Sequence, residues 1–289
     1  MSQEIIDVHV HCFTGRAQAG VVSNGLEELR REGLRTMAVL GMVNTHFDSE
    51  TIWNLVPRYV ENQGDPLFHE AEDLLELARL NDPLILPLVD TRYLFGEVSA
   101  ILKAYIKQGF RGLKGIYLAD DGNDLGVGNV PDTFGISLEQ YQRREWAFFE
   151  FAEANDLPMV YHMDARRYGD VMKALLDDFP RVRVDFAHFG IGRRAMGKFL
   201  DRYPNVFTDL AALLPHMQNN PASYRDFILH YADRVCFGSD AVLYRPETVL
   251  DYVRMVRALE LPKEVETQVF SRNPRKFLGC ALDSFCPHE

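Results

Sequence analysis

The sequence has little that would indicate a covalent framework or a polyanionic partner. Its four cysteines are widely separated and form no Cys-x-x-Cys pair, so we expect neither a disulfide framework nor a thiolate zinc site. Acidic residues outnumber basic ones, and the net charge is −11. Because nucleic acid and anionic membranes attract basic patches, this charge argues against both as partners.

Long hydrophobic runs and linkers are also missing. No apolar stretch approaches the length that spans a membrane, and the N-terminus lacks a basic segment followed by an apolar run. No stretch rich in proline, serine or charge separates two parts of the chain. We therefore expect a soluble, unprocessed, cytoplasmic protein with one domain over residues 1–289; whether several copies assemble stays open.

What the sequence does contain is a regular alternation of buried strand patterns and amphipathic helix patterns. Strands are expected at 5–13, 36–43, 84–90, 110–117, 157–162, 182–188, 206–210 and 234–240. Helices are expected at 26–33, 51–60, 69–80, 97–108, 137–155, 166–179, 193–203, 224–232, 246–259 and 264–278. Eight strands alternating with helices predict an α/β fold, a single (β/α)8 TIM barrel. The alternative is an open doubly wound sheet, which usually has fewer strands and a glycine-rich phosphate turn after the first.

One segment, 119–136, interrupts the alternation. It holds four glycines and four aspartates, a composition from which we expect neither a packed helix nor a strand. Because it follows a predicted strand, it would lie at the mouth of the barrel as a lid or specificity loop. A solvated surface insertion is the alternative.

The first strand carries an Asp-x-His-x-His pattern. Strand alternation would place Asp7, His9 and His11 on one face, with the aliphatic residues between them on the other. Two neighbouring imidazoles on a rigid strand suit a divalent metal. The motif is short, so it needs further ligands from elsewhere in the chain.

Further polar side chains stand at the ends of other predicted strands. They are Lys114, His162, His188 and Asp240. In a parallel barrel these ends converge on one mouth, where such residues are typical of an active site. A single histidine there would more often be a core residue, but four histidines and an aspartate together favour a metal centre.

These motifs resemble the amidohydrolase superfamily over nearly the whole chain. The branch most similar is the amidohydrolase-related family, which includes the aminocarboxymuconate-semialdehyde decarboxylases and several lactone and amide hydrolases. The motifs are Asp7-x-His9-x-His11, Gly109-Phe-Arg-Gly-Leu-Lys114, Tyr161-His162, Phe186-Ala-His188, Phe237-Gly-Ser-Asp240 and Ser271-Arg-Asn-Pro-Arg-Lys-Phe-Leu-Gly279.

The resemblance implies one divalent metal ion, with zinc the expected metal. It implies that the ligands are His9, His11, His162 and Asp240, and that His188 is not a strong ligand but orients the attacked carbonyl or the metal-bound water. Asp240 would accept the proton of that water. Asp7 would form a hydrogen bond to one of the ligand residues and so orient it; the alternative is that Asp7 only packs within the barrel.

Lys114 allows two interpretations. Binuclear members of the superfamily place a carboxylated lysine on the fourth strand, whereas the branch resembled here has mononuclear sites. We favour an uncarboxylated lysine that contacts an anionic substrate. Other residues that could bind a substrate carboxylate are Arg92, Arg166, Arg167, Tyr244 and Arg245; those that could form an apolar wall are Phe47, Trp53, Tyr117 and Phe134.

The expected function is therefore a metal-dependent hydrolase that uses a metal-activated water on a small carboxylated lactone, amide or ester. The alternative enzyme is a metal-dependent non-oxidative decarboxylase of an unsaturated or aromatic acid. A non-catalytic binding protein on the same scaffold is the third alternative. The sequence does not distinguish among substrates.

Overall fold

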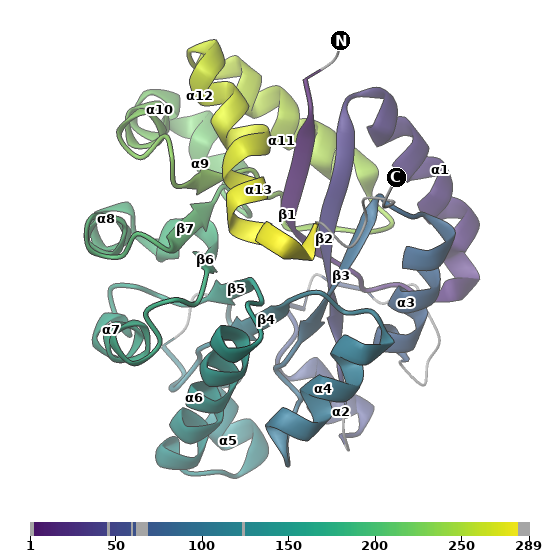
Figure 1. The fold of residues 1–289 in the computed structure, drawn as a ribbon, viewed down its shortest axis with the longest axis vertical. Coiled ribbons are helices and arrows are strands. Elements are labelled where there is room, and N and C mark those ends of the chain that lie inside the picture. The colour runs from purple at the N-terminus through teal and green to yellow at the C-terminus, as the bar shows by residue number, and fades with distance from the viewer. Residues whose placement is uncertain (1–2, 45–46, 59, 62–68, 123–124, 283–289) are drawn as a thin grey trace.

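The computed structural model describes residues 3–44, 47–58, 60–61, 69–122 and 125–282. Within them the chain forms one curled sheet of nine parallel strands with helices around its outside (Figure 1). Strands β1 to β8 lie side by side in chain order, and β9 lies on the free side of β1. The strands are β1 (Ile5–His11), β2 (Leu34–Met42), β3 (Ile85–Asp90), β4 (Leu113–Ile116), β5 (Met159–His162), β6 (Val184–Phe186), β7 (Val206–Asp209), β8 (Val235–Cys236) and β9 (Ala241–Val242).

Helices follow most of the strands, as the alternation predicts. They are α1 (Ala19–Arg31), α2 (Ser49–Trp53), α3 (Glu70–Leu80), α4 (Val98–Gln108), α5 (Val130–Phe134), α6 (Leu138–Ala154), α7 (Gly169–Asp178), α8 (Arg193–Arg202), α9 (Leu214–Asn219), α10 (Pro221–His230), α11 (Pro246–Ala258), α12 (Lys263–Thr267) and α13 (Asn273–Leu278). Among the described residues no helix is both long and apolar enough to cross a membrane.

Two hydrophobic cores lie on the two faces of the sheet. The larger one fills the space between the strands and the surrounding helices. The smaller one gathers alternate residues from several strands, such as Ile6, Leu40 and Leu88, together with Phe277 of α13. Because its members come from strands across the whole sheet, this smaller core fills the concave side of the curl. On each strand, every second side chain points to this concave side. Such side chains near the carboxyl ends of the strands therefore face the same interior as the smaller core.

An irregularity in β1 decides which way the two first histidines point. Asp7 pairs with Met37 and Val10 with Val39, so β1 uses one residue more than β2 over this stretch. Val8 consequently belongs to the inner core and Val10 to the outer one. The prediction that Asp7 shares a face with both histidines is therefore wrong, because the extra residue reverses the alternation between them.

The predicted eighth strand, 234–240, is a strand only over β8, and β9 follows after its predicted end. Strand β8 pairs with β7, and β9 pairs with β1. The residues between them still bond to β1: the amide of Val8 donates to Phe237 O over 3.0 Å, and the amide of Asp240 donates to His9 O over 2.9 Å. Asp240 has a positive φ of 57°, which bends the chain there. This segment thus joins the two ends of the sheet, and its bend is why the count is nine strands rather than eight.

Helix α1 begins well before the predicted start at residue 26. Segment 15–25 is rich in small and polar residues, which is typical of a connection, yet most of it is helical. Val22 packs with Leu26 and Leu29 on one buried face. Gly25 is required by packing, since a Cβ atom there would lie 2.8 Å from Cγ of Pro246 at the start of α11. The small residues therefore mark a close helix contact.

The glycine- and aspartate-rich segment 119–136 contains helix α5, so the prediction that it forms no packed helix is wrong. The Asn129 side chain accepts a hydrogen bond from the amide of Asp132 at the start of the helix, and Pro131 stands in its first turn. Gly135 ends it in the left-handed conformation. These are ordinary start and stop signals, and they outweigh the composition of the surrounding loop.

Candidate active site

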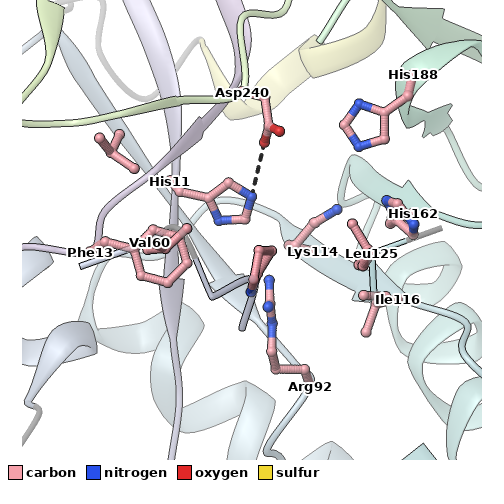
Figure 2. A pocket seen from close by; sticks show the side chains of 12 residues that line it. His11, Phe13, Val60, Arg92, Lys114, Ile116, Leu125, His162, His188 and Asp240 are labelled. Carbon is pink, nitrogen blue, oxygen red and sulfur yellow. Dashed lines mark ion pairs between the residues drawn. The ribbon is translucent and has the colours of Figure 1, made fainter. Parts of the chain in front are cut away.

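Three predicted metal ligands converge at the carboxyl ends of the strands. Nε2 of His9 lies 3.3 Å and Nε2 of His11 lies 3.2 Å from Oδ1 of Asp240. One ligand atom from each of the three residues lies within 4.8 Å of the others. Figure 2 shows the His11–Asp240 pair at one side of the cavity, with His162 and His188 beyond it. Strand β1 and the bend after β8 together produce this arrangement.

The charge states of these three residues suit a cation. Burial lowers the pKa of His9 to about 4 and also lowers the pKa of His11. Burial alone would raise the pKa of Asp240, but the hydrogen bond from His11 and the neighbouring rings outweigh it, and the pKa falls below its usual range. At neutral pH the site therefore has neutral imidazoles and an ionised carboxylate. Those are the forms in which these groups bind metals.

Asp209 is a site residue that the sequence analysis missed. It ends β7, and its Oδ2 lies 2.8 Å from Nδ1 of His9. The attraction of His9 offsets the cost of burial and keeps the pKa of Asp209 low, so the carboxylate accepts and Nδ1 carries the proton. Nε2 of His9 is then a lone-pair donor, buried and without a hydrogen-bond partner among the described residues. The sequence does contain a signal for Asp209: like Asp240, it is an aspartate at the end of a predicted strand.

His188 lies near the rings of His9 and His162, although it does not end a strand as predicted. Strand β6 stops at Phe186, and residues 188–191 all have positive φ values, 59° at His188 itself. The His188 ring centre lies 5.2 Å from that of His9 and 5.0 Å from that of His162. The amide of His188 donates to Asp209 Oδ1 over 2.8 Å. Asp209 therefore holds both the His9 ring and the backbone turn that presents His188.

The protonated nitrogen of His188 follows from its partner. Its Nδ1 lies 2.8 Å from the carbonyl oxygen of Ala211. A carbonyl oxygen can only accept, so Nδ1 carries a proton and Nε2 is the nitrogen left for a contact in the cavity. His188 also forms a second group of possible ligand atoms with His9 and Asp209. In that group the Asp209 carboxylate is already engaged by His9 and by the His188 amide.

His162, the fourth predicted ligand, is not in either group of converging donor atoms among the described residues. It ends β5 and lines the same cavity. The structure thus brings three of the four predicted ligands together and leaves the fourth on the cavity wall beside His188.

Sequence comparison identifies the family. A model described as "Amidohydrolase" matches residues 6–280. The chain belongs to the amidohydrolase family. Among curated proteins, no sequence matches it significantly.

Solved structures with the same fold include three that bear on this amidohydrolase. A probable 2-pyrone-4,6-dicarboxylic acid hydrolase from Acinetobacter baumannii, with citric acid bound, is 13% identical, with coverage of 96% and 99% of the two chains and a TM-score of 0.63. The lactonase from Listeria monocytogenes is 8% identical, with coverage of 99% and 95% and a TM-score of 0.58. A proposed metal-dependent hydrolase from Lactobacillus casei is 13% identical, with coverage of 96% of each chain and a TM-score of 0.52. At these identities the likeness shows the fold.

The cavity of this amidohydrolase encloses about 60 Å³ and is lined by both polar and apolar side chains. Lys114 of β4 is buried in its wall, and burial lowers the pKa of its amine to about 8. In the described part of the chain this amine has no hydrogen bond or ion pair. The lining residues are His11, Phe13, Pro57, Val60, Arg92, Lys114, Ile116, Leu125, His162, His188, Asp240 and Val242.

Arg92 shares the cavity but its guanidinium is engaged. Its Nη2 donates to Asp90 Oδ2 over 2.6 Å, its Nε lies 3.0 Å from both oxygens of Asp90, and its Nη1 donates to Leu55 O over 2.8 Å. Arg92 therefore forms a rigid wall of the cavity, and Lys114 carries a positive charge that no described residue pairs with.

Three further side chains expected to contact substrate, Tyr117, Tyr244 and Arg166, lie outside the cavity lining. Tyr117 is buried, stacks on Tyr141 and accepts a hydrogen bond from Gln142. The hydroxyl of Tyr244 donates to the backbone oxygen of Glu61. Arg166 is held by Asp164 at 2.7 Å and lines a different hollow. Their substrate contacts remain predictions without support from this arrangement.

The Asp7 side chain contacts the predicted ligand His9 at the backbone amide of His9 and not at its imidazole ring. Its carboxylate accepts hydrogen bonds from the amide of His9 over 3.0 Å and from the hydroxyl of Ser239 over 2.6 Å. Burial raises the pKa of Asp7 to about 7. The carboxyl group thereby ties β1 to the segment that ends in Asp240, and so fixes the spacing of the converging donors.

Proposed function

We propose that this amidohydrolase is a metal-dependent hydrolase of a small carboxylated lactone, amide or ester. The observation that carries the proposal is the convergence of His9, His11 and Asp240 at a cavity, with neutral imidazoles and an ionised carboxylate. A buried Nε2 of His9 with no hydrogen-bond partner among the described residues is costly unless another group satisfies it. A divalent cation would satisfy it.

Zinc is the metal we propose, because imidazole and carboxylate donors are its usual ligands. His9, His11 and Asp240 would hold it, and His162 on the cavity wall is the proposed fourth ligand. When bound, such an ion would polarise a carbonyl oxygen and lower the pKa of a water molecule. Asp209 would keep Nε2 of His9 available throughout.

The protein's own groups would handle the proton and the orientation of the water. Asp240 is ionised and can accept a proton from the attacking water. Nε2 of His188, a cavity-lining side chain, can form a hydrogen bond with the same water and aim it at the carbonyl carbon. The contact of Nδ1 with the backbone leaves Nε2 as the ring nitrogen available for this role.

A carboxylated lactone is the substrate class to test first. The Lys114 amine lines the cavity, has no hydrogen-bond or ion-pair partner among the residues that the structure describes, and could bind a carboxylate. Two proteins of the same fold are named for lactone chemistry, a 2-pyrone-4,6-dicarboxylic acid hydrolase and a lactonase. A 2-pyrone dicarboxylate combines the cyclic ester and the negative charge that this cavity would accept.

Metal analysis and product analysis together test the proposal. Purified protein should contain about one equivalent of zinc or another divalent ion. His11→Ala and Asp240→Ala should lose both the metal and hydrolysis of carboxylated lactones, whereas His230→Ala, which changes an exposed histidine, should keep both. Release of carbon dioxide without ring opening would replace hydrolysis with decarboxylation. Full activity of metal-free protein would contradict the proposal.

A further inference from the structure

A second, larger hollow lies beside the carboxyl ends of β5 and β6. It encloses about 770 Å³ and shares no lining residue with the catalytic cavity. Its walls come from the segment after β5 and from the beginnings of α7 and α8. Six of its lining side chains are cationic: Arg166, Arg167, Lys173, Arg193, Arg194 and Lys198. This concentration of positive charge stands out in a chain whose net charge is −11.

Half of these cations are already neutralised by neighbouring carboxylates. The ion pairs are Arg166 with Asp164 at 2.7 Å, Arg167 with Asp120 at 2.5 Å and Lys173 with Asp170 at 2.8 Å. Of these three acids only Asp170 lines the hollow. The carboxylates therefore hold the paired cations in place without cancelling the remaining charge.

The other half have no such partner. Arg193, Arg194 and Lys198 form no ion pair with any residue that the structure describes. The Cζ atom of Arg193 lies 3.8 Å from the centre of the Tyr224 ring, and this stacking fixes its guanidinium in the wall. Its buried Nη1 has no hydrogen-bond acceptor in the described part of the chain. Arg193 is thus held in place before any ligand arrives, beside the exposed cations Arg194 and Lys198.

The backbone adds to the same field. Helix α8 has no side-chain cap, no acidic residue in its first turn, and begins instead with Arg193 and Arg194. Cations at the positive end of a helix are unfavourable, so a bound anion would offset the cost. Gly192, just before α8, leaves room for the Arg166 side chain. A Cβ atom there would lie 2.9 Å from Cδ of Arg166.

We propose that this hollow is a binding site for a small anion with two or more negative charges, a phosphate compound or a polycarboxylate. Arginine forks match both kinds of group, so the charge and the geometry are shared by the two classes. The site is separate from the catalytic cavity and does not depend on the hydrolase proposal. The amide of Ala165 donates to Gly190 O over 3.0 Å, which joins the two loops that form it.

Calorimetric titration of the full-length protein tests the site, with pyrophosphate and tricarballylate as separate probes at low ionic strength. Saturable binding of either probe is expected, and the preferred probe identifies phosphate or carboxylate as the ligand class. Added salt should weaken the binding, because the site is solvent-accessible.

Charge reversal locates the bound probe. Arg194→Glu with Lys198→Glu should weaken binding about a hundredfold, since each charge-assisted contact contributes about tenfold or more, and Arg194→Gln alone about tenfold. The control, Arg254→Glu with Arg257→Glu, makes the same charge change on exposed positions of α11 and should leave binding within about threefold. His11→Ala should also bind normally, because it alters only the catalytic cavity.

Three outcomes would overturn the site. One is the absence of saturable binding by either probe. Another is an equal loss in the double variant and its α11 control, which would indicate the net charge alone. The third is a loss in His11→Ala with none in the double variant, which would assign the anion to the catalytic cavity. None of these outcomes bears on hydrolysis, which is measured separately.

Discussion

The carboxylate of Asp209 accepts a hydrogen bond from Nδ1 of His9 over 2.8 Å, and this contact determines which nitrogen of His9 faces Asp240. Both side chains are buried. A second carboxyl group, Asp185 of β6, lies close to Asp209, and burial and the charge of Asp209 raise its pKa well above the usual range. Burial therefore favours the protonated form of Asp185, and it leaves the negative charge of the pair on Asp209, the residue that orients His9.

Replacing Asp209 by asparagine should weaken metal binding without removing any proposed ligand. The amide can no longer hold the His9 proton with a full negative charge, so we expect a loss of about tenfold to a hundredfold in affinity. Competition against a fluorescent chelator measures it. Asp164→Asn is the matched control, a buried aspartate near the end of β5 that pairs with Arg166. Equal affinities in the two variants would contradict the role of Asp209.

His188→Asn should separate metal binding from turnover. The variant should keep roughly stoichiometric metal, since His188 is not a proposed ligand, but lose about a hundredfold in kcat, the usual effect of removing one oriented polar contact. Metal analysis and steady-state kinetics are measured on the same sample, with His216→Asn, an exposed histidine, as control. Loss of the metal would make His188 a ligand, and unchanged turnover would make it a packing residue.

Lys114→Met should raise KM for a carboxylated substrate by about tenfold to a hundredfold, because one charged hydrogen bond is lost. An uncharged ester of the same substrate should be affected far less. In the unmodified protein, KM should also rise as the pH passes through about 8, where the buried amine loses its proton. A second equivalent of metal that requires bicarbonate would instead indicate the carboxylated form of Lys114.

The sequence predicts the alternation of strands and helices well because each buried strand is a local apolar run. It also predicts that His11, His162 and Asp240 gather at one cavity, since parallel strands end at the same edge. Those inferences need only the order of the strands. The same order does not reveal the distances between side chains, so it could not separate His162 from the three converging donors.

The remaining features depend on contacts between distant parts of the chain. The extra residue in β1 appears only when β1 is paired with β2, and it changes the side of Asp7. The left-handed turn at His188 is held by Asp209, which lies 21 residues away. In the sequence Arg92 is a candidate for substrate contact, and only the structure shows that Asp90 pairs with it. Each of these is a tertiary interaction that no local pattern contains.

Glu70 provides a test of the fold that is independent of catalysis. This buried first residue of α3 accepts hydrogen bonds from the amides of Phe13 and Met42, both at 3.3 Å, and so joins the ends of β1 and β2. Its other oxygen, Oε2, has no partner among the described residues. Burial raises the pKa of Glu70 from 4.5 to about 8.

The raised pKa means that ionisation of Glu70 opposes folding. Between pH 4.5 and about 8 the folded protein retains a proton that the unfolded chain releases, so the free energy of unfolding falls as the pH rises through this window. Glu70→Gln removes this effect. The variant should match the parent at pH 4.5 and be more stable by an amount on the order of a few kcal/mol above pH 8. Urea unfolding at several pH values measures the difference, with exposed Glu72→Gln on the same helix as the control. A difference that does not change with pH would show that Glu70 is ionised in the folded protein throughout.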